Sequence, residues 1–277
     1  MDPDRDLDAC YEHVMKLVDE VGDIISSRFF APKAKVVTKS SNIDFVTETD
    51  QQVEKHLMDG ITAKFPSHKF IGEEETSEGK AAELTDAPTW IIDPVDGTMN
   101  FVHGFPHSCV SIALLVDKVT EIGIVYNPVL NQKFTARRGK GAFLNGKEIH
   151  VSSVTSLADA LICTETGTSR DEQKMVVVME NLNKLTRIAN GIRCLGAAAL
   201  NICMVALGGA DCYFEFGLHA WDMAAGELIV REAGGVSLDP SGGALDLMSR
   251  RCLVAASQEL ANELIPQLTQ YHPLPRD

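Results

Sequence analysis

A run of short apolar segments between residues 110 and 149 restricts the fold of this chain more than any other feature. The predicted strands are 110–116, 121–126, 132–137, 142–144 and 147–149. The last two are separated only by Asn145-Gly146, and an Asn-Gly pair at such a place is a strong signal of a two-residue hairpin. Because strands with such short connections pair antiparallel, we predict an antiparallel sheet in the middle third of the chain.

Two helices are predicted ahead of this sheet. Apolar residues recur every three or four positions from Leu7 to Phe29, which is typical of one long amphipathic helix. A second helix is predicted to begin at Thr49, with Thr49 as N-cap and Gln52 in the capping-box position, and to end before Pro66. The polar segment 39–46 between the helices is expected to be a loop.

Beyond about residue 150 the pattern changes to an alternation of strands and helices. The predicted elements are strands at 161–164, 212–216 and near 236 and 253, and helices at 172–185, 197–207, 222–233 and 259–268. We therefore predict a single domain, 1–277, of the α/β (α+β) class. It is expected to contain two packed subdomains, about 1–150 and 151–277, because no Gly- or Pro-rich linker separates them.

Charge and cysteine content restrict the partners and the compartment. The 25 Lys and Arg against 39 Asp and Glu leave a net charge of −14, which argues against nucleic acid or an anionic membrane as a partner. No apolar run approaches a membrane span, and the N-terminus does not resemble a signal peptide. Seven cysteines without a C-x-x-C pair indicate reduced thiols. We expect a cytoplasmic protein.

The segment from Trp90 to Asn100 carries the clearest sign of chemistry. An apolar strand is predicted to stop at Asp93-Pro94, and the fixed φ of Pro94 holds Asp93 near Asp96. Two such carboxylates, with the carbonyl of Val95, supply the oxygen ligands that Mg²⁺ prefers. Gly97 and Thr98 then offer backbone N–H groups for a phosphate. Taken alone, this segment could equally be a turn that ends a strand.

Two further acidic positions lie far from it in the sequence. Glu73 belongs to the run Gly72-Glu73-Glu74-Glu75, which by itself would be a solvated loop. Asp222 follows Trp221 where a helix is predicted to open, and by itself it would be an N-cap.

The combination resembles the inositol monophosphatase family, within the superfamily of lithium-sensitive, magnesium-dependent phosphatases. The resemblance rests on D-P-x-D-G-T at 93–98, W-D-x-A-x-G at 221–226 and G-E-E at 72–74, and it covers essentially the whole chain. It implies a layered α/β/α/β/α sandwich of the sugar-phosphatase type, with mixed and antiparallel sheets, and usually a homodimer. It also implies Mg²⁺-dependent hydrolysis of myo-inositol monophosphate, with inhibition by lithium.

The same resemblance assigns roles to individual residues. Glu73 and Asp93, with the carbonyl of Val95, would hold one Mg²⁺, whereas Asp93, Asp96 and Asp222 would hold a second, with two or three ions per site. Glu73 and the Thr98 hydroxyl would orient and deprotonate the attacking water, which makes Glu73, Thr98 and Asp93 the expected catalytic residues. The residues expected to bind substrate are Glu73, Val95, Asp96, Gly97, Thr98, Gly196, Ala197, Ala198, Glu215 and Asp222.

At the sugar-like end of the substrate, Glu215 would accept hydrogen bonds from ring hydroxyls, and the Ala198 N–H would donate one. Met99 and Ala197 depart from the family pattern, in which Thr and Ser or Thr are frequent at these two positions. These departures put the substrate preference in doubt more than the reaction.

Several alternatives stay open from the sequence. A bisphosphate phosphatase would need an Arg/Lys pocket, whereas Glu215 lies among apolar residues in the sequence. A galactose or histidinol phosphate phosphatase would keep the same chemistry. A non-catalytic metal-binding protein is a remote alternative, because all the expected ligands are present. His103 and His107 are not expected to bind zinc, since Gly104 and Pro106 prevent a helical pair.

Overall fold

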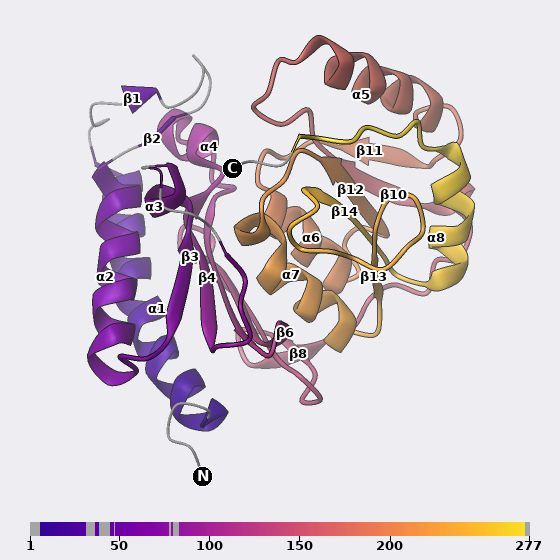
Figure 1. The fold of residues 1–277 in the computed structure, drawn as a ribbon. Coiled ribbons are helices and arrows are strands. Elements are labelled where there is room, and N and C mark those ends of the chain that lie inside the picture. Colours follow the sequence, from indigo (N-terminus) through magenta and orange to yellow (C-terminus); the bar gives the residue numbers. More distant parts are fainter. Residues whose placement is uncertain are drawn as a thin grey trace.

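The computed structural model describes residues 6–31, 37–38, 45–46, 48–77, 79 and 83–274. Its elements are stacked in layers, with helices on both outer faces, two sheets inside them and a helical layer between the sheets (Figure 1). This is the layered α/β/α/β/α arrangement with mixed sheets that the sequence predicts. Within the described residues, no helix is long and apolar enough to cross a membrane.

The first sheet has seven strands in the order β3-β4-β5-β6-β7-β8-β9. Their bounds are β3 Lys69–Gly72, β4 Thr89–Asp96, β5 Cys109–Val116, β6 Val119–Asn127, β7 Gln132–Arg137, β8 Ala142–Leu144 and β9 Lys147–Ile149. All neighbours pair antiparallel except β3 and β4, which are parallel. The turn between β8 and β9 has positive φ at both Asn145 and Gly146, as a type I′ hairpin requires.

Two long helices cover the outer face of this sheet, α1 (Leu7–Phe29) and α2 (Glu48–Lys64). The apolar stripe of α1 is fully buried at Val14, Val18 and Ile25, and it packs with α2 against β4, β5 and β6. Each such side chain contributes roughly 1.5–3 kcal/mol of burial free energy. This packing fixes β4, which carries three of the predicted metal ligands, Asp93, Val95 and Asp96.

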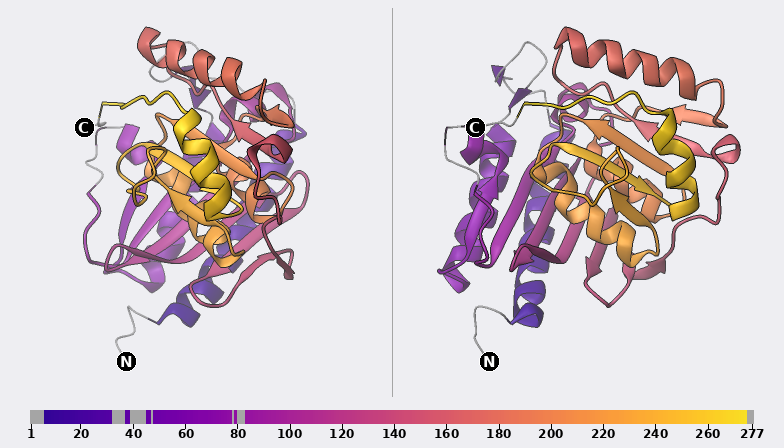
Figure 2. Two further views of the ribbon diagram at one scale, coloured as in Figure 1. Left: turned by 90° about the vertical axis from the view of Figure 1, so that its right-hand side faces the viewer. Right: turned by 45° about the vertical axis from the view of Figure 1, so that its right-hand side comes forward.

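The second sheet has five strands in the order β11-β10-β12-β14-β13. Their bounds are β10 Leu161–Thr164, β11 Gly191–Arg193, β12 Cys212–Phe216, β13 Val236–Leu238 and β14 Arg251–Ala255. The helices α5 (Glu172–Leu185) and α8 (Gln258–Leu264) lie on its outer side (Figure 2). The short 3-10 helices η2 (Leu157–Asp159) and η3 (Ile265–Gln267) complete this half.

The central layer consists of α6 (Ala198–Ala206) and α7 (Ala220–Glu232), whose apolar residues share one core with the facing sides of both sheets. The contact between α7 and the first sheet is close, because a Cβ on Gly123 of β6 would lie 2.6 Å from the carbonyl oxygen of Ala225. A side chain at Gly123 would therefore push α7 away from the sheet.

Several local predictions differ from the structure. Residues 39–44 of the predicted loop lie outside the described residues, but Phe45–Val46 form a strand, β2, that pairs with β1 (Val37–Thr38). The second helix begins at Glu48, so Thr49 lies inside its first turn and is not the N-cap. Two short helices, α3 (Glu73–Ser77) and α4 (Thr98–His103), were not predicted as helices of these lengths.

Candidate active site

A cavity of about 690 Å³ lies where the end of β4 meets the first residues of α3, α4, α6 and α7. It is lined by every predicted site residue except one: Glu73, Asp93, Val95, Asp96, Gly97, Thr98, Gly196, Ala198, Glu215 and Asp222. The exception is Ala197, which is buried as the residue before α6. The cavity thus collects residues from positions 73 to 222 into one place.

A bulge in β4 sets the geometry of the first two aspartates. β4 does not stop at Asp93-Pro94, as predicted, but continues to Asp96. Asp93 pairs with Ser111 and Asp96 pairs with Cys109, so β4 contains one residue more than β5 between these two pairs. In a regular strand, residues three apart point to opposite faces, and the extra residue allows both carboxylates to face the same cavity. Pro94 is tolerated at this point because a bulge leaves a residue without ladder hydrogen bonds.

Asp222 reaches the same place from α7. The helix begins at Ala220, two residues before its predicted start, so Asp222 is the third residue of α7 and His219 is the N-cap. Its Oδ2 accepts a hydrogen bond from the N–H of His219 at 2.7 Å. The carbonyl of Trp221 accepts a bond from the Ser111 hydroxyl at 2.9 Å, which ties the start of α7 to β5. Asp222 is therefore fixed by its own helix and by the sheet.

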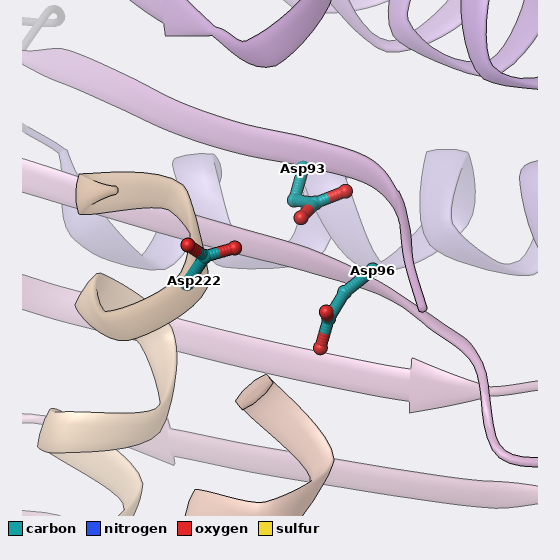
Figure 3. Close-up of side chains that lie close together, drawn as sticks. All are labelled: Asp93, Asp96 and Asp222. Atoms are coloured by element: carbon teal, nitrogen blue, oxygen red, sulfur yellow. The ribbon is translucent and has the colours of Figure 1, made fainter. Parts of the chain in front are cut away.

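Carboxylate oxygens of Asp93, Asp96 and Asp222 all lie within 4.8 Å of one another (Figure 3). Burial raises the pKa of Asp93 well above its usual value, and the nearby charges of Glu73, Asp96 and Asp222 raise it further. Burial likewise raises the pKa of Asp222, and that of Asp96 to about 7. Such a cluster is costly when ionised, so it favours either bound protons or a cation among its members.

The chemistry of these donors fits a hard divalent cation. The group consists of carboxylate oxygens, with the carbonyl of Val95 beside it, and such a set suits Mg²⁺, Ca²⁺ or Mn²⁺ better than zinc. It is the one group of three or more possible metal-ligating side chains found among the described residues. His103 and His107 do not take part in it.

Glu73 is positioned by a helix that sequence analysis did not predict. It is the first residue of α3, and the next two backbone N–H groups, of Glu74 and Glu75, donate to the carboxylate of Glu54 at 2.9 and 3.1 Å. Glu54 is buried on α2, and burial raises its pKa to about 7. The sequence does contain a signal for the role of Glu54: it is a charged residue next to Val53, on the apolar face of a predicted helix.

Thr98 has a second partner that sequence analysis also missed. Its hydroxyl lies 3.0 Å from the carbonyl oxygen of Val95 and 3.3 Å from a carboxylate oxygen of Asp50, both within reach as acceptors. Asp50 is fully buried on α2. The hydroxyl of Thr98 is therefore oriented by α2, the same helix that supports Glu73 through Glu54.

The loop before α6 is held by Glu165. Its Oε1 accepts hydrogen bonds from the N–H groups of Leu195 and Gly196, at 2.5 and 2.7 Å, and from the side-chain amide of Asn201 at 2.8 Å. The Ala198 N–H, expected to meet the substrate, instead donates to Asp96 at 3.2 Å. In this structure, therefore, Ala198 stabilises a predicted metal ligand.

Glu215 lines the cavity from β12. Burial raises its pKa to about 8, and its Oε2 accepts a hydrogen bond from the Tyr213 hydroxyl at 2.7 Å. Glu215 lies among apolar residues in the sequence, but the fold brings basic residues close to it. Arg170 and Arg250 line the cavity, and the positive charge of Lys174 acts on Glu215. These basic residues could not be placed near Glu215 from the sequence, because α5 and the segment before β14 are remote from β12 along the chain.

Comparison with known proteins gives a consistent result. The model of the inositol monophosphatase family matches residues 6–272. Human inositol monophosphatase 1 is 47% identical over 269 residues, which cover 97% of this chain and 96% of the human protein. Among solved structures, the extragenic suppressor protein suhB of Bartonella henselae is 30% identical with a TM-score of 0.85, covering 95% of this chain and 99% of its own. An IMPase of Thermotoga maritima is 31% identical with a TM-score of 0.83, covering 94% and 96%.

Proposed function

This chain belongs to the inositol monophosphatase family, and on that premise we propose that it is a Mg²⁺-dependent phosphomonoesterase that hydrolyses myo-inositol monophosphate to inositol and phosphate. The observation that carries the metal dependence is the group of three aspartates whose oxygens lie within 4.8 Å of one another. Asp93, Asp96 and Asp222 would hold one ion, and Glu73, Asp93 and the carbonyl of Val95 another. Bound Mg²⁺ supplies the positive field that polarises a phosphate ester and makes a bound water a stronger nucleophile.

Residues of the chain itself would position the water, accept its proton and bind the two ends of the substrate. Thr98 would hold the attacking water through its hydroxyl, whose orientation is restricted by Asp50 and the carbonyl of Val95. Glu73 would take the proton of that water. The backbone at Gly97 and Thr98 would hold the phosphate, and Gly196 and Glu215 would contact the leaving alcohol.

A bisphosphate is the second candidate substrate, because Arg170, Lys174 and Arg250 lie near Glu215. The Arg250 guanidinium, however, already donates to the carbonyls of Gly217, Leu218 and Leu274. Binding a second phosphate there would compete with these bonds. We therefore place the monophosphate first.

We also propose that the chain is one domain with subdomains at about 1–150 and 151–277, and that it acts in the cytoplasm as a homodimer. No nucleic acid or membrane is required as a partner. These proposals rest on the family and on the net charge of −14.

The test is phosphate release from a panel of phosphates of inositol, galactose, fructose and nucleotides, with Mg²⁺ and with excess EDTA. We expect the highest kcat/KM for a myo-inositol monophosphate and no activity in EDTA. Undiminished activity in EDTA would exclude the metal-dependent mechanism. A preference for another phosphate would show that the proposed substrate is wrong, but it would leave the metal-dependent mechanism intact.

A further inference from the structure

Lys174 is a buried cation that the proposed mechanism does not use. It is the third residue of α5, only 2% exposed, and its backbone N–H donates to the N-cap Asp171 at 2.8 Å. Its ammonium makes no hydrogen bond or ion pair with any residue in the described part of the chain. A buried ammonium costs free energy unless its three donors are used, and a positive charge at the N-terminus of a helix is disfavoured as well.

Two glycines leave the space in which this ammonium lies. Nζ of Lys174 is 2.5 Å from the point where a Cβ on Gly167 would stand, and 3.1 Å from the corresponding point on Gly217. Both glycines line the cavity and both have positive φ. A side chain at Gly167 would displace the ammonium, and one at Gly217 would crowd it, so the ammonium lies directly behind two glycines of the cavity wall.

The carboxylate of Glu215 approaches the same point. Its Oε1 is 3.1 Å from the Cβ position of Gly167, whereas its Oε2 accepts the Tyr213 hydroxyl. No direct hydrogen bond or ion pair joins Lys174 to Glu215, although the charge of Glu215 favours the charged form of Lys174. The Lys174 ammonium, which has no protein acceptor among the described residues, and Oε1 of Glu215 therefore lie 2.5 and 3.1 Å from the same point, close enough for one hydroxyl oxygen to hydrogen-bond to both.

We propose that Lys174 is a specificity-determining residue that binds the leaving alcohol together with Glu215. The ammonium donates to a hydroxyl oxygen of the polyol, and the same hydroxyl, or its neighbour on the ring, donates to Oε1 of Glu215. The ligand class is a polyol that carries a phosphate at one end and uncharged hydroxyls at the other. This inference rests on the proposed function for the position of the phosphate.

The surrounding charges favour a hydroxyl over a second anion. Lys174 faces Arg250 and Arg170, but also Glu215 and Asp171. One guanidinium N–H group of Arg170 donates to the carbonyls of Gly167 and Ser169. An anion placed beside Lys174 would also lie beside the carboxylate of Glu215. A neutral hydroxyl can bond to both groups without that repulsion.

The test compares Lys174→Met with the wild-type protein on two substrates, myo-inositol 1-phosphate and p-nitrophenyl phosphate, which has no ring hydroxyls. We expect kcat/KM for the inositol phosphate to fall about tenfold more than kcat/KM for p-nitrophenyl phosphate, mainly through KM, because a hydrogen bond from a charged donor is lost. The melting temperature should stay the same or rise, since a buried ammonium without protein acceptors is replaced by an apolar side chain of similar size. A purely structural lysine would show the opposite change in stability.

The matched control is Lys184→Met on the exposed side of the same helix, and this variant should leave kcat/KM unchanged for both substrates. The double variant Lys174→Met, Glu215→Gln should lose less than the two single losses combined, because both residues bind the same hydroxyls. Lys174→Gln keeps a neutral donor, so its loss of kcat/KM for the inositol phosphate should be smaller than that of Lys174→Met. If Lys174→Met does not fold, the same comparison of two substrates is made with Lys174→Gln.

Equal losses on both substrates, or no loss, would overturn the proposal. So would a loss confined to inositol 1,4-bisphosphate, because Lys174 would then bind an anion. If the wild-type protein hydrolyses p-nitrophenyl phosphate but not inositol monophosphate, only the proposed function has failed. Galactose 1-phosphate then serves as the polyol substrate in the same comparison.

Discussion

Replacing Asp93 by Asn should stabilise the protein in the absence of metal, although it removes a proposed catalytic residue. The pKa values of Asp93, Asp96 and Asp222 are raised in the folded protein by burial and mutual repulsion. The folded state therefore binds more protons than the unfolded state, and stability falls as pH rises through the range between the two sets of pKa values. Asn at position 93 keeps an oxygen that can accept the bond from the Val95 N–H, at 3.0 Å in the wild type.

The spacing of the cluster gives the size of the effect. Two ionised carboxylates with oxygens 4.8 Å apart, the largest separation within this cluster, repel each other by about 3–4 kcal/mol at an effective dielectric constant of 20. The raised pKa values mean that bound protons already relieve part of this repulsion. We therefore expect almost no difference near pH 4, close to the ordinary Asp pKa of 3.8, and a gain for Asp93→Asn that grows to about 1–3 kcal/mol by about pH 9.

Urea denaturation in EDTA, followed across this pH range, measures the difference directly. With Mg²⁺ the order should reverse, because ligand at a hundred times its Kd stabilises the wild type by about 2.7 kcal/mol and the variant has lost an anionic ligand. Asp59→Asn is the control, an exposed aspartate paired with Lys55, and it should change stability by less than about 0.5 kcal/mol. A variant no more stable than the wild type in EDTA at high pH, or one stabilised equally by Mg²⁺, would refute the reasoning.

Three further outcomes follow from the structure. In Glu54→Gln, stability should decline less between about pH 4.5 and 7 than in the wild type, because the pKa of Glu54 is raised to about 7. Denaturation at several pH values measures this decline, and the same decline in both proteins would contradict the prediction. Glu165→Ala should raise KM for inositol phosphate about tenfold, since three hydrogen bonds that hold Leu195, Gly196 and Asn201 are lost; unchanged kinetics would exclude this positioning role. Lithium should inhibit in an uncompetitive or mixed manner, as a small hard cation that takes the same oxygen ligands; steady-state kinetics that show purely competitive inhibition, or none, would contradict it.

Much of the fold could be predicted from local pattern. The bounds of β7, β10, β12 and α5 match the prediction because each element has a clear period between polar or glycine-containing flanks. The hairpin at Asn145 was also predictable, since its turn residues need positive φ. These features depend on neighbours in the sequence, which periodicity and turn chemistry describe well.

The parts that could not be predicted depend on contacts between distant segments. The bulge in β4 is defined by its register against β5, and Pro94 within β4 is compatible with a bulge but equally with the end of a strand. The supports of the site, Asp50 and Glu54, are carboxylates on a helix that otherwise packs against the sheet. Lys174 and Glu215 approach each other only at Gly167, which has no side chain to separate them. Each of these arrangements departs from local expectation close to the cavity.

The turnover of Asp222→Asn with myo-inositol 1-phosphate at saturating Mg²⁺ is the most direct test of a metal-dependent phosphatase site built on the three aspartates. Asn at this third position of α7 keeps an acceptor for the His219 N–H, so the variant should fold. We predict a fall in kcat of at least about a hundredfold, because an anionic ligand to the proposed ion is lost. Near-normal turnover in the folded variant would contradict the assignment of this cluster as the metal site.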